Sequence, residues 1–144
     1  MQGIPRFLAT SGSDKLFLLR CFAVVAAVRL CLSLLSYRIL IRWLPKAHGT
    51  PATDRDALRR VGWGVRNASR LVPRASCLTQ ALAAQFLLAR SGHESRIRIG
   101  VAKDATGKFL AHAWLISDGR LVIGGRSSEL RRYRSLVDLD PEAP

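Results

Sequence analysis

The spacing of the apolar residues changes once along this chain, from helical before Gly92 to alternating after it. Before that point apolar residues recur every three or four positions, which is typical of helices. The segment Arg96-Ile97-Arg98-Ile99-Gly100-Val101 then alternates strictly, as a strand with one solvated face does. Helices followed by strands predict an α+β fold in which helices pack on a small antiparallel sheet. A chain of 144 residues is long enough for one such domain but too short for two.

The first amphipathic helix of this domain is expected to begin near Asp54. The acidic side chains in Thr53–Leu58 suit the positive end of a helix dipole, and apolar residues then recur at helical spacing to about residue 72. Gly62 and Gly64 interrupt this helix, and each should weaken it by up to about 1 kcal/mol relative to alanine.

A second helix and a hairpin follow. The helix should run from near Ser76, a capping residue, to Arg90, with Gly92 as its stop. Phe109–Ser117 reads as the second strand, and Asp118-Gly119 is a strong two-residue hairpin signal before the returning strand 120–123. Residues 126–144 form a basic and then acidic tail with little core-forming content.

Residues 14–44 are the most apolar stretch of the chain, and arginines at positions 20, 29 and 38 interrupt it. No uncharged run therefore approaches the ~18–20 residues that a membrane span needs. We expect either a helix or helix pair packed on the domain or on a partner protein, or a helix lying in a membrane interface with its arginine stems extended toward water.

The net charge of +13 predicts attraction to an anionic partner: a nucleic acid, a lipid surface, or an acidic protein or peptide. Because zinc-finger spacing, aromatic-rich basic strands and a basic region with heptads are all missing from the sequence, we predict no nucleic-acid partner. Cys21, Cys31 and Cys77 give an odd count without paired spacing, and we see no cleavable signal sequence, so a cytoplasmic protein is expected. The three histidines are scattered, and we predict no metal site and no cofactor.

Two residues combine into a candidate catalytic pair. Cys77 opens the second helix, where unpaired backbone N–H groups favour a thiolate and can bind a developing oxyanion. His112 lies in the middle of the second predicted strand, Phe109–Ser117, on the same face as Leu110, Trp114 and Ile116. A lone buried histidine or helical cysteine is usually structural, but the two in this order suit a nucleophile with its general base. Cys21 and Cys31 sit in apolar helix, where burial raises a thiol's pKa.

The segment from Ser76-Cys77-Leu78 to Gly125, with its His112-Ala113-Trp114 strand and Asp118-Gly119-Arg120 hairpin, resembles the transglutaminase-like cysteine peptidase of lasso-peptide biosynthesis, in its stand-alone leader-peptidase form. The likeness covers roughly residues 55–125. It implies a papain/transglutaminase-like fold made of an apolar, basic N-terminal helical extension at 1–50, the peptidase domain at 51–125 and the tail at 126–144.

The resemblance also implies an activity and partners. Cys77 would attack the bond between leader and core of a ribosomally made precursor, with His112 as base. The enzyme would work with a leader-recognition protein and an ATP-dependent lasso cyclase. The cysteine usage and the apolar, basic stretch at residues 14–44 predict its location: the cytoplasm, with peripheral contact at the inner membrane face through that stretch. Two alternatives are a non-catalytic scaffold of degenerate peptidase fold that binds a peptide or membrane, and a Cys-dependent acyltransferase.

The family's third catalytic residue is an Asp about a dozen positions after the His, where this chain has Val122-Ile123-Gly124-Gly125. A two-residue turn at Asp118-Gly119 would place Gly125 opposite His112, and Asp118 about 20 Å away along the strand. We therefore expect a Cys–His dyad whose ring is oriented by a backbone carbonyl, by a water, or by Ser127 or Ser128.

Overall fold

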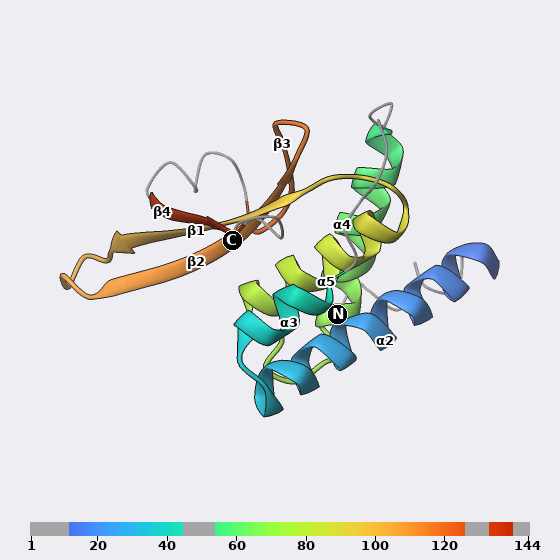
Figure 1. The fold of residues 1–144 in the computed structure, drawn as a ribbon, viewed down its shortest axis with the longest axis horizontal. Helices are drawn as coiled ribbons and strands as arrows, with labels where there is room; N and C mark the ends of the chain where they lie inside the picture. Colours follow the sequence, from blue (N-terminus) through green and yellow to red (C-terminus); the bar gives the residue numbers. More distant parts are fainter. Residues whose placement is uncertain (1–11, 45–53, 126–132, 140–144) are drawn as a thin grey trace.

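The computed structural model describes residues 12–44, 54–125 and 133–139. Four helices precede four strands in these parts of the chain, which confirms the α+β prediction (Figure 1). The elements are α2 (Gly12–Leu34), α3 (Tyr37–Trp43), α4 (Arg55–Ser69), α5 (Cys77–Arg90), β1 (Arg96–Lys103), β2 (Phe109–Ser117), β3 (Arg120–Ile123) and β4 (Arg134–Leu139).

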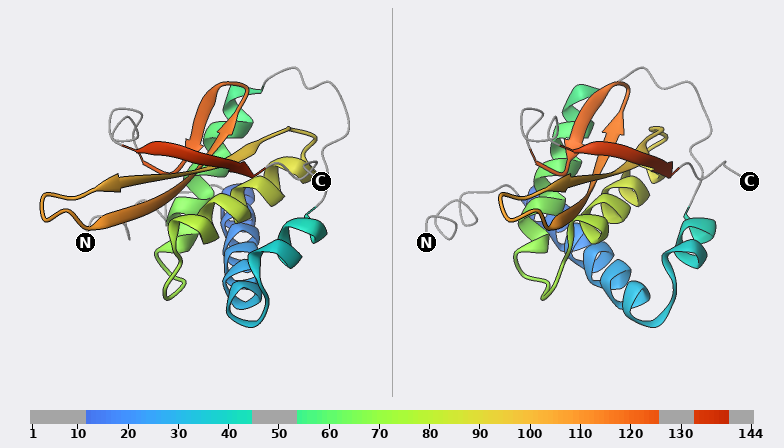
Figure 2. Two further views of the ribbon diagram at one scale, coloured as in Figure 1. Left: turned by 60° about the vertical axis from the view of Figure 1, so that its left-hand side comes forward. Right: turned by 90° about the vertical axis from the view of Figure 1, so that its left-hand side faces the viewer.

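The strands form one antiparallel sheet in the order β3-β2-β1-β4, so β2 and β1 are its central strands. Helix α5 packs against β2 and α4 against β3, while α2 packs against both helices. Figure 2 shows α5 running along one side of the sheet, with α2 beyond it. The molecule thus has a sheet layer, a middle layer of α4 and α5, and an outer layer made by α2.

Both middle helices begin where the sequence predicts, and α5 also ends there, whereas α4 ends at Ser69, before the end of its apolar pattern near residue 72. The Asp54 carboxylate accepts the backbone N–H groups of Asp56 and Ala57 at 3.0 and 3.2 Å, which caps α4. The Ser76 hydroxyl accepts the N–H of Thr79 at 3.2 Å, which caps α5. At the other end of α5, Gly92 has a φ of +82°, and the next N–H bonds back to the Leu88 carbonyl.

The core lies between the sheet and the three long helices. Its fully enclosed side chains include Leu82 and Leu88 of α5, Val65 of α4, Leu115 of β2 and Val25 of α2. Burial of a leucine or valine stabilises a fold by roughly 1.5–3 kcal/mol. Because α2 supplies part of this core, the prediction of a packed N-terminal helix pair is confirmed for the face of α2 that meets α4 and α5.

The glycines of α4 mark close approaches between elements. A Cβ on Gly62 would lie 2.5 Å from the Val122 carbonyl oxygen of β3, and one on Gly64 would lie 2.6 Å from Cys21 Sγ of α2. The sequence identified these glycines only as a local weakness of the helix. In the structure they allow α4 to approach β3 on one side and α2 on the other.

The structure departs from the sequence-based expectation near the C-terminus. The sequence predicts a tail with little core-forming content at residues 126–144, yet Arg134–Leu139 forms β4 along the edge of β1. The division of the chain into an extension, a peptidase domain and a tail stays a prediction.

By length and composition, α2 is also apolar enough to cross a membrane, a criterion that buried core helices meet as well. Its Cys21, Val25 and Val28 are buried against the rest of the fold, and Asp14 pairs with Arg60 of α4 at 3.2 Å. In the structure, α2 is thus attached to the domain along one face.

Candidate active site

Cys77 is the first residue of α5, and its thiol is free and half-buried. The Ser76 hydroxyl accepts a hydrogen bond from the Thr79 N–H. Among the described residues, the backbone N–H groups of Cys77 and Leu78 have no hydrogen-bond acceptor. These two donors, at the positive end of α5, are the groups that could hold an oxyanion beside the sulfur.

His112 lies in β2 opposite Gly100 of β1, and its ring is half-buried. The Nε2–H donates a short hydrogen bond to the Gly124 carbonyl. Because a carbonyl can only accept, this contact places the proton of the neutral ring on Nε2 and leaves the lone pair on Nδ1. The expectation that a backbone carbonyl orients the ring is what the structure shows.

Two aromatic side chains enclose the His112 ring. The ring stacks on Trp114 at a centroid distance of 6.1 Å and a tilt of 22°, and Tyr133 lies 5.3 Å away. Tyr133, just before β4, was not singled out in the sequence, because nothing in a single tyrosine of a basic segment indicates which strand it will meet.

The β2–β3 hairpin places Gly124 at the ring. Asp118 and Gly119 both have positive φ, 49° and 70°, as a type I′ turn requires, and Ser117 pairs with Arg120 as predicted. A bulge then shifts the register, so that Leu115 pairs with Ile123 rather than with Val122.

The count that places Gly125 opposite His112 assumes an unbroken register, and this bulge breaks it. The pairing of β2 with β3 ends at Leu115 and Ile123. Asp118 remains in the turn, six residues along β2 from the histidine. Ser127 and Ser128 lie outside the described residues.

Gly124 also explains why no carboxylate side chain occupies this position. Its φ is +119°, and a Cβ there would collide with Cβ of Trp114. An aspartate at 124 would thus be strained and sterically blocked. The Gly124-Gly125 pair is the sequence feature that could have indicated this close approach of the backbone at 124 to Trp114.

The structure does not bring the two predicted catalytic side chains into contact. Ala113 and Leu115 of β2 belong to the core shared with α5, and Cys77 packs against that core. Side chains alternate along a strand, so His112 and Trp114 project from the opposite face of β2. Among the described residues no hydrogen bond joins the Cys77 thiol to the His112 ring.

The other thiols have different surroundings. Cys21 is fully buried between α2 and α4, and burial raises the pKa of its thiol to about 11 against the opposing effect of Arg20 and Arg60. This confirms the expectation that Cys21 is not an activated thiol. No cluster of three potential metal ligands occurs within 12–44, 54–125 and 133–139.

Comparison with known families gives one match: the sequence profile of the Transglutaminase-like superfamily covers residues 21–138. The chain belongs to the transglutaminase-like superfamily. The match begins within α2 and ends within β4, and it includes both Cys77 and His112. Comparisons with proteins of curated function and with solved structures find no match.

The superfamily includes cysteine peptidases and acyltransferases, whose shared step is attack of a thiolate on an amide or ester carbonyl. The papain/transglutaminase-like fold prediction, with helices on a small antiparallel sheet and an apolar N-terminal helix, is confirmed.

Proposed function

We propose that this protein is a cysteine peptidase that removes the leader from a lasso-peptide precursor, together with a leader-recognition protein and an ATP-dependent cyclase. The observation that carries the proposal is the position of Cys77, a free and half-buried thiol on the first residue of a capped helix in a transglutaminase-like chain. The His112-Ala113-Trp114 strand and the hairpin after it support the leader-peptidase assignment through the resemblance.

In the proposed reaction the Cys77 thiolate attacks the carbonyl carbon of the bond between leader and core. The backbone N–H groups of Cys77 and Leu78 hold the oxyanion of the tetrahedral intermediate. His112 protonates the leaving amine through its imidazolium, the C–N bond breaks, and a thioester remains on Cys77. Water, deprotonated by the ring, then releases the leader acid and restores the thiol.

This reaction requires the His112 ring to reach the thiol, whereas in the structure the ring faces the other side of β2. The beginning of β2 extends beyond the helix layer, where Phe109, Leu110 and Ala111 are exposed. We infer that the reaction needs the start of β2 to turn so that the face carrying His112 meets α5, because neighbouring positions on a strand point to opposite faces.

A second function, that of a non-catalytic scaffold, is favoured by the orientation of the His112 ring. The ring is held by a backbone carbonyl rather than by a carboxylate, and it points away from α5. A scaffold of this fold would bind the leader and deliver the precursor to the cyclase without cleaving it. The Cys-dependent acyltransferase differs only in the nucleophile that resolves the thioester.

The test is mass spectrometry of a precursor incubated with this protein, its leader-recognition partner, and the cyclase with ATP. We expect the wild-type protein to release the leader, and Cys77→Ala and His112→Ala each to lower the rate at least about a thousandfold, because nucleophile and base act as a unit. Two control variants should cleave the precursor at the wild-type rate: Cys31→Ala, which removes a thiol of α2, and Asp118→Asn.

The outcomes separate the candidates. Cleavage by the Cys77→Ala protein would eliminate the cysteine mechanism. A wild-type protein that binds the precursor without cleaving it would establish the scaffold, and an amide or ester of the leader in place of its free acid would establish the acyltransferase.

A further inference from the structure

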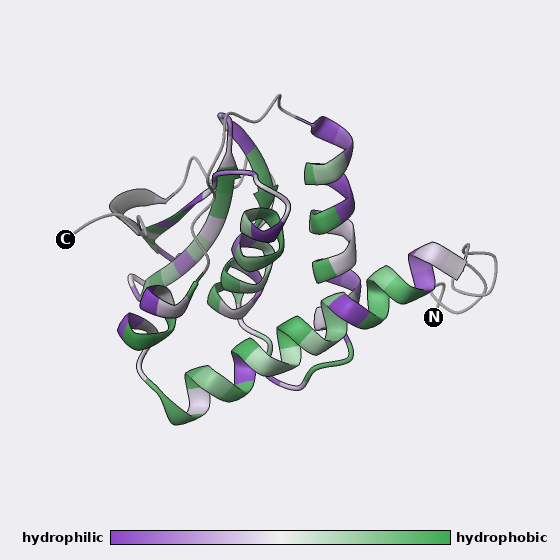
Figure 3. Cartoon of the chain, turned by 45° about the vertical axis from the view of Figure 1, so that its right-hand side comes forward, coloured by the Kyte–Doolittle hydropathy of each residue, from purple (hydrophilic) through white to green (hydrophobic). Residues whose placement is uncertain are grey.

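The outer face of α2 carries an uninterrupted apolar stripe. At 100° per residue, six exposed or half-exposed positions fall on one side of the helix, away from the buried Cys21, Val25 and Val28. These positions are Leu16, Leu19, Ala23, Ala27, Leu30 and Leu34. The four leucines are each at least 60% exposed. Figure 3 shows α2 as a mostly hydrophobic helix along the side of the molecule remote from the sheet.

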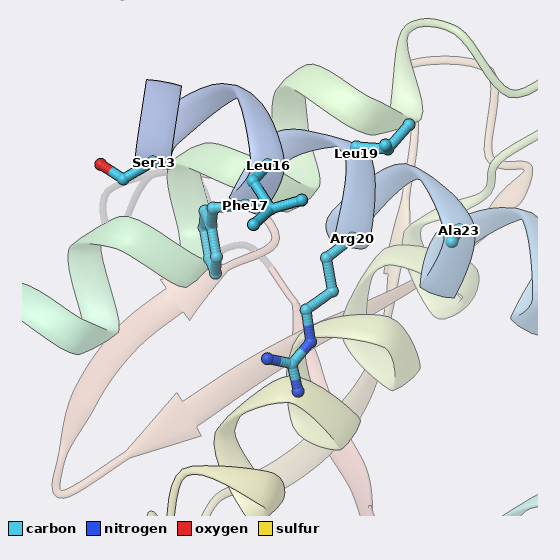
Figure 4. Close-up of a pocket in the computed structure, with 6 residues that line it drawn as sticks. All are labelled: Ser13, Leu16, Phe17, Leu19, Arg20 and Ala23. Atoms are coloured by element: carbon cyan, nitrogen blue, oxygen red, sulfur yellow. The ribbon is translucent and has the colours of Figure 1, made fainter. Parts of the chain in front are cut away.

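Exposed apolar groups continue past the end of α2. Leu35, Ile39 and Trp43, the last two in α3, are exposed, and Trp43 is the most exposed of them at 80%. A shallow apolar hollow opens near the start of α2, where Leu16 and Leu19 project from successive turns (Figure 4). Contiguous apolar surface of this extent marks a binding surface in soluble proteins.

The charges around this surface indicate its occupant. Lys15 and Arg20 lie beside the stripe on α2, and Arg38 and Arg42 are exposed on α3. The whole chain carries a net charge of +13. The surface has leucines at its centre, long arginine side chains at its margin and an exposed tryptophan. This composition is typical of protein surfaces that lie at the boundary between lipid headgroups and acyl chains.

We propose that α2 and α3 dock the protein on an anionic lipid surface, with the α2 stripe lying in the plane of the membrane. The opposite face of α2 argues against spanning, because crossing the bilayer would strip Cys21, Val25 and Val28 from α4 and α5 and break the Asp14–Arg60 pair. The domain supplies the polar side that an interfacial helix ordinarily carries itself. This inference is independent of the proposed peptidase activity.

The experiment is co-sedimentation of the full-length protein with phosphatidylcholine vesicles, with and without phosphatidylglycerol, at low and high salt. We expect binding to the anionic vesicles that weakens as salt rises. Leu19→Glu with Leu30→Glu should lower the partition coefficient at least about tenfold, because two apolar side chains are lost from the acyl region and two negative charges are placed against an anionic surface. Both sites are exposed, so the circular dichroism and melting temperature should stay unchanged.

The control is Phe109→Glu, which replaces another exposed apolar side chain, 66% exposed at the start of β2, by glutamate, and it should bind the vesicles like the wild type. A position-specific readout uses brominated lipids, which should quench tryptophan emission in the wild type and much less in Trp43→Phe. Trp63 on α4 and the buried Trp114 on β2 are present in both proteins, so the difference in quenching between them reports on Trp43.

Three results would overturn the proposal. One is absence of binding to anionic vesicles. Another is binding that the Leu19→Glu, Leu30→Glu double variant retains. The third is a dimer in solution, without lipid, that this double variant dissociates, since the stripe would then be the contact between two copies of the chain.

Discussion

A backbone carbonyl at position 124 contacts His112 where the resemblance to lasso leader peptidases implies a carboxylate. The Gly124 carbonyl fixes the tautomer and the orientation of the His112 ring as a carboxylate would. As a neutral acceptor it stabilises a developing imidazolium less than an ionised group does. If the protein is a peptidase, this exchange predicts a slower enzyme than one with a complete triad.

The buried thiol of Cys21 makes a separate, pH-dependent prediction. Burial raises its pKa from the ordinary 9.0 to about 11, so between these values the unfolded chain loses a proton that the folded chain retains. The free energy of unfolding should therefore fall as the pH rises from 9 to 11, by about 2–3 kcal/mol at most. Urea unfolding across this range should show a steeper loss for the wild type than for Cys21→Ala. Parallel pH profiles for the two proteins would contradict the assigned burial.

Among the elements, those with local signals were predictable from the sequence. Asp54 and Ser76 start helices because their side chains satisfy free N–H groups, and Asp118-Gly119 accepts the positive φ angles of a tight hairpin. The β2–β3 bulge has no such signature, because it results from how Val122 and Ile123 both reach the core. The strand β4 was missed because its pairing with β1 is a long-range contact within a strongly charged segment.

The close approach of α2 to α4 at Gly64 gives a prediction at this scale. Gly64→Ala should destabilise the fold by about 1–3 kcal/mol, although alanine favours helices, because its Cβ would meet Cys21 Sγ and the Phe17 ring at 2.6 and 2.7 Å. Thermal unfolding measures the loss. Gly12→Ala is the control, since a Cβ there meets nothing within 4 Å, and it should be neutral or slightly stabilising. Equal melting temperatures for the two variants would mean that α2 does not pack on α4 as described.

For the molecule as a whole, the sequence predicted the fold class and the elements that carry the candidate site, but not the side from which the helices cover the sheet. The face that His112 shares with Trp114 follows from alternation and is confirmed by their stacked rings. Both faces of β2 are apolar, however, so the pattern does not tell which one meets α5. Only the packed structure shows that Ala113 and Leu115 take that place.

The central claim is that Cys77 is a nucleophile served by His112. The most direct measurement is the rate of alkylation of each cysteine at neutral pH by iodoacetamide, followed by peptide mass mapping with and without the precursor. We predict that Cys77 reacts faster than the half-buried Cys31, that the precursor protects it, and that His112→Ala slows its reaction while leaving that of Cys31 unchanged. A Cys77 that reacts no faster than Cys31, with no effect of His112→Ala, would contradict the claim.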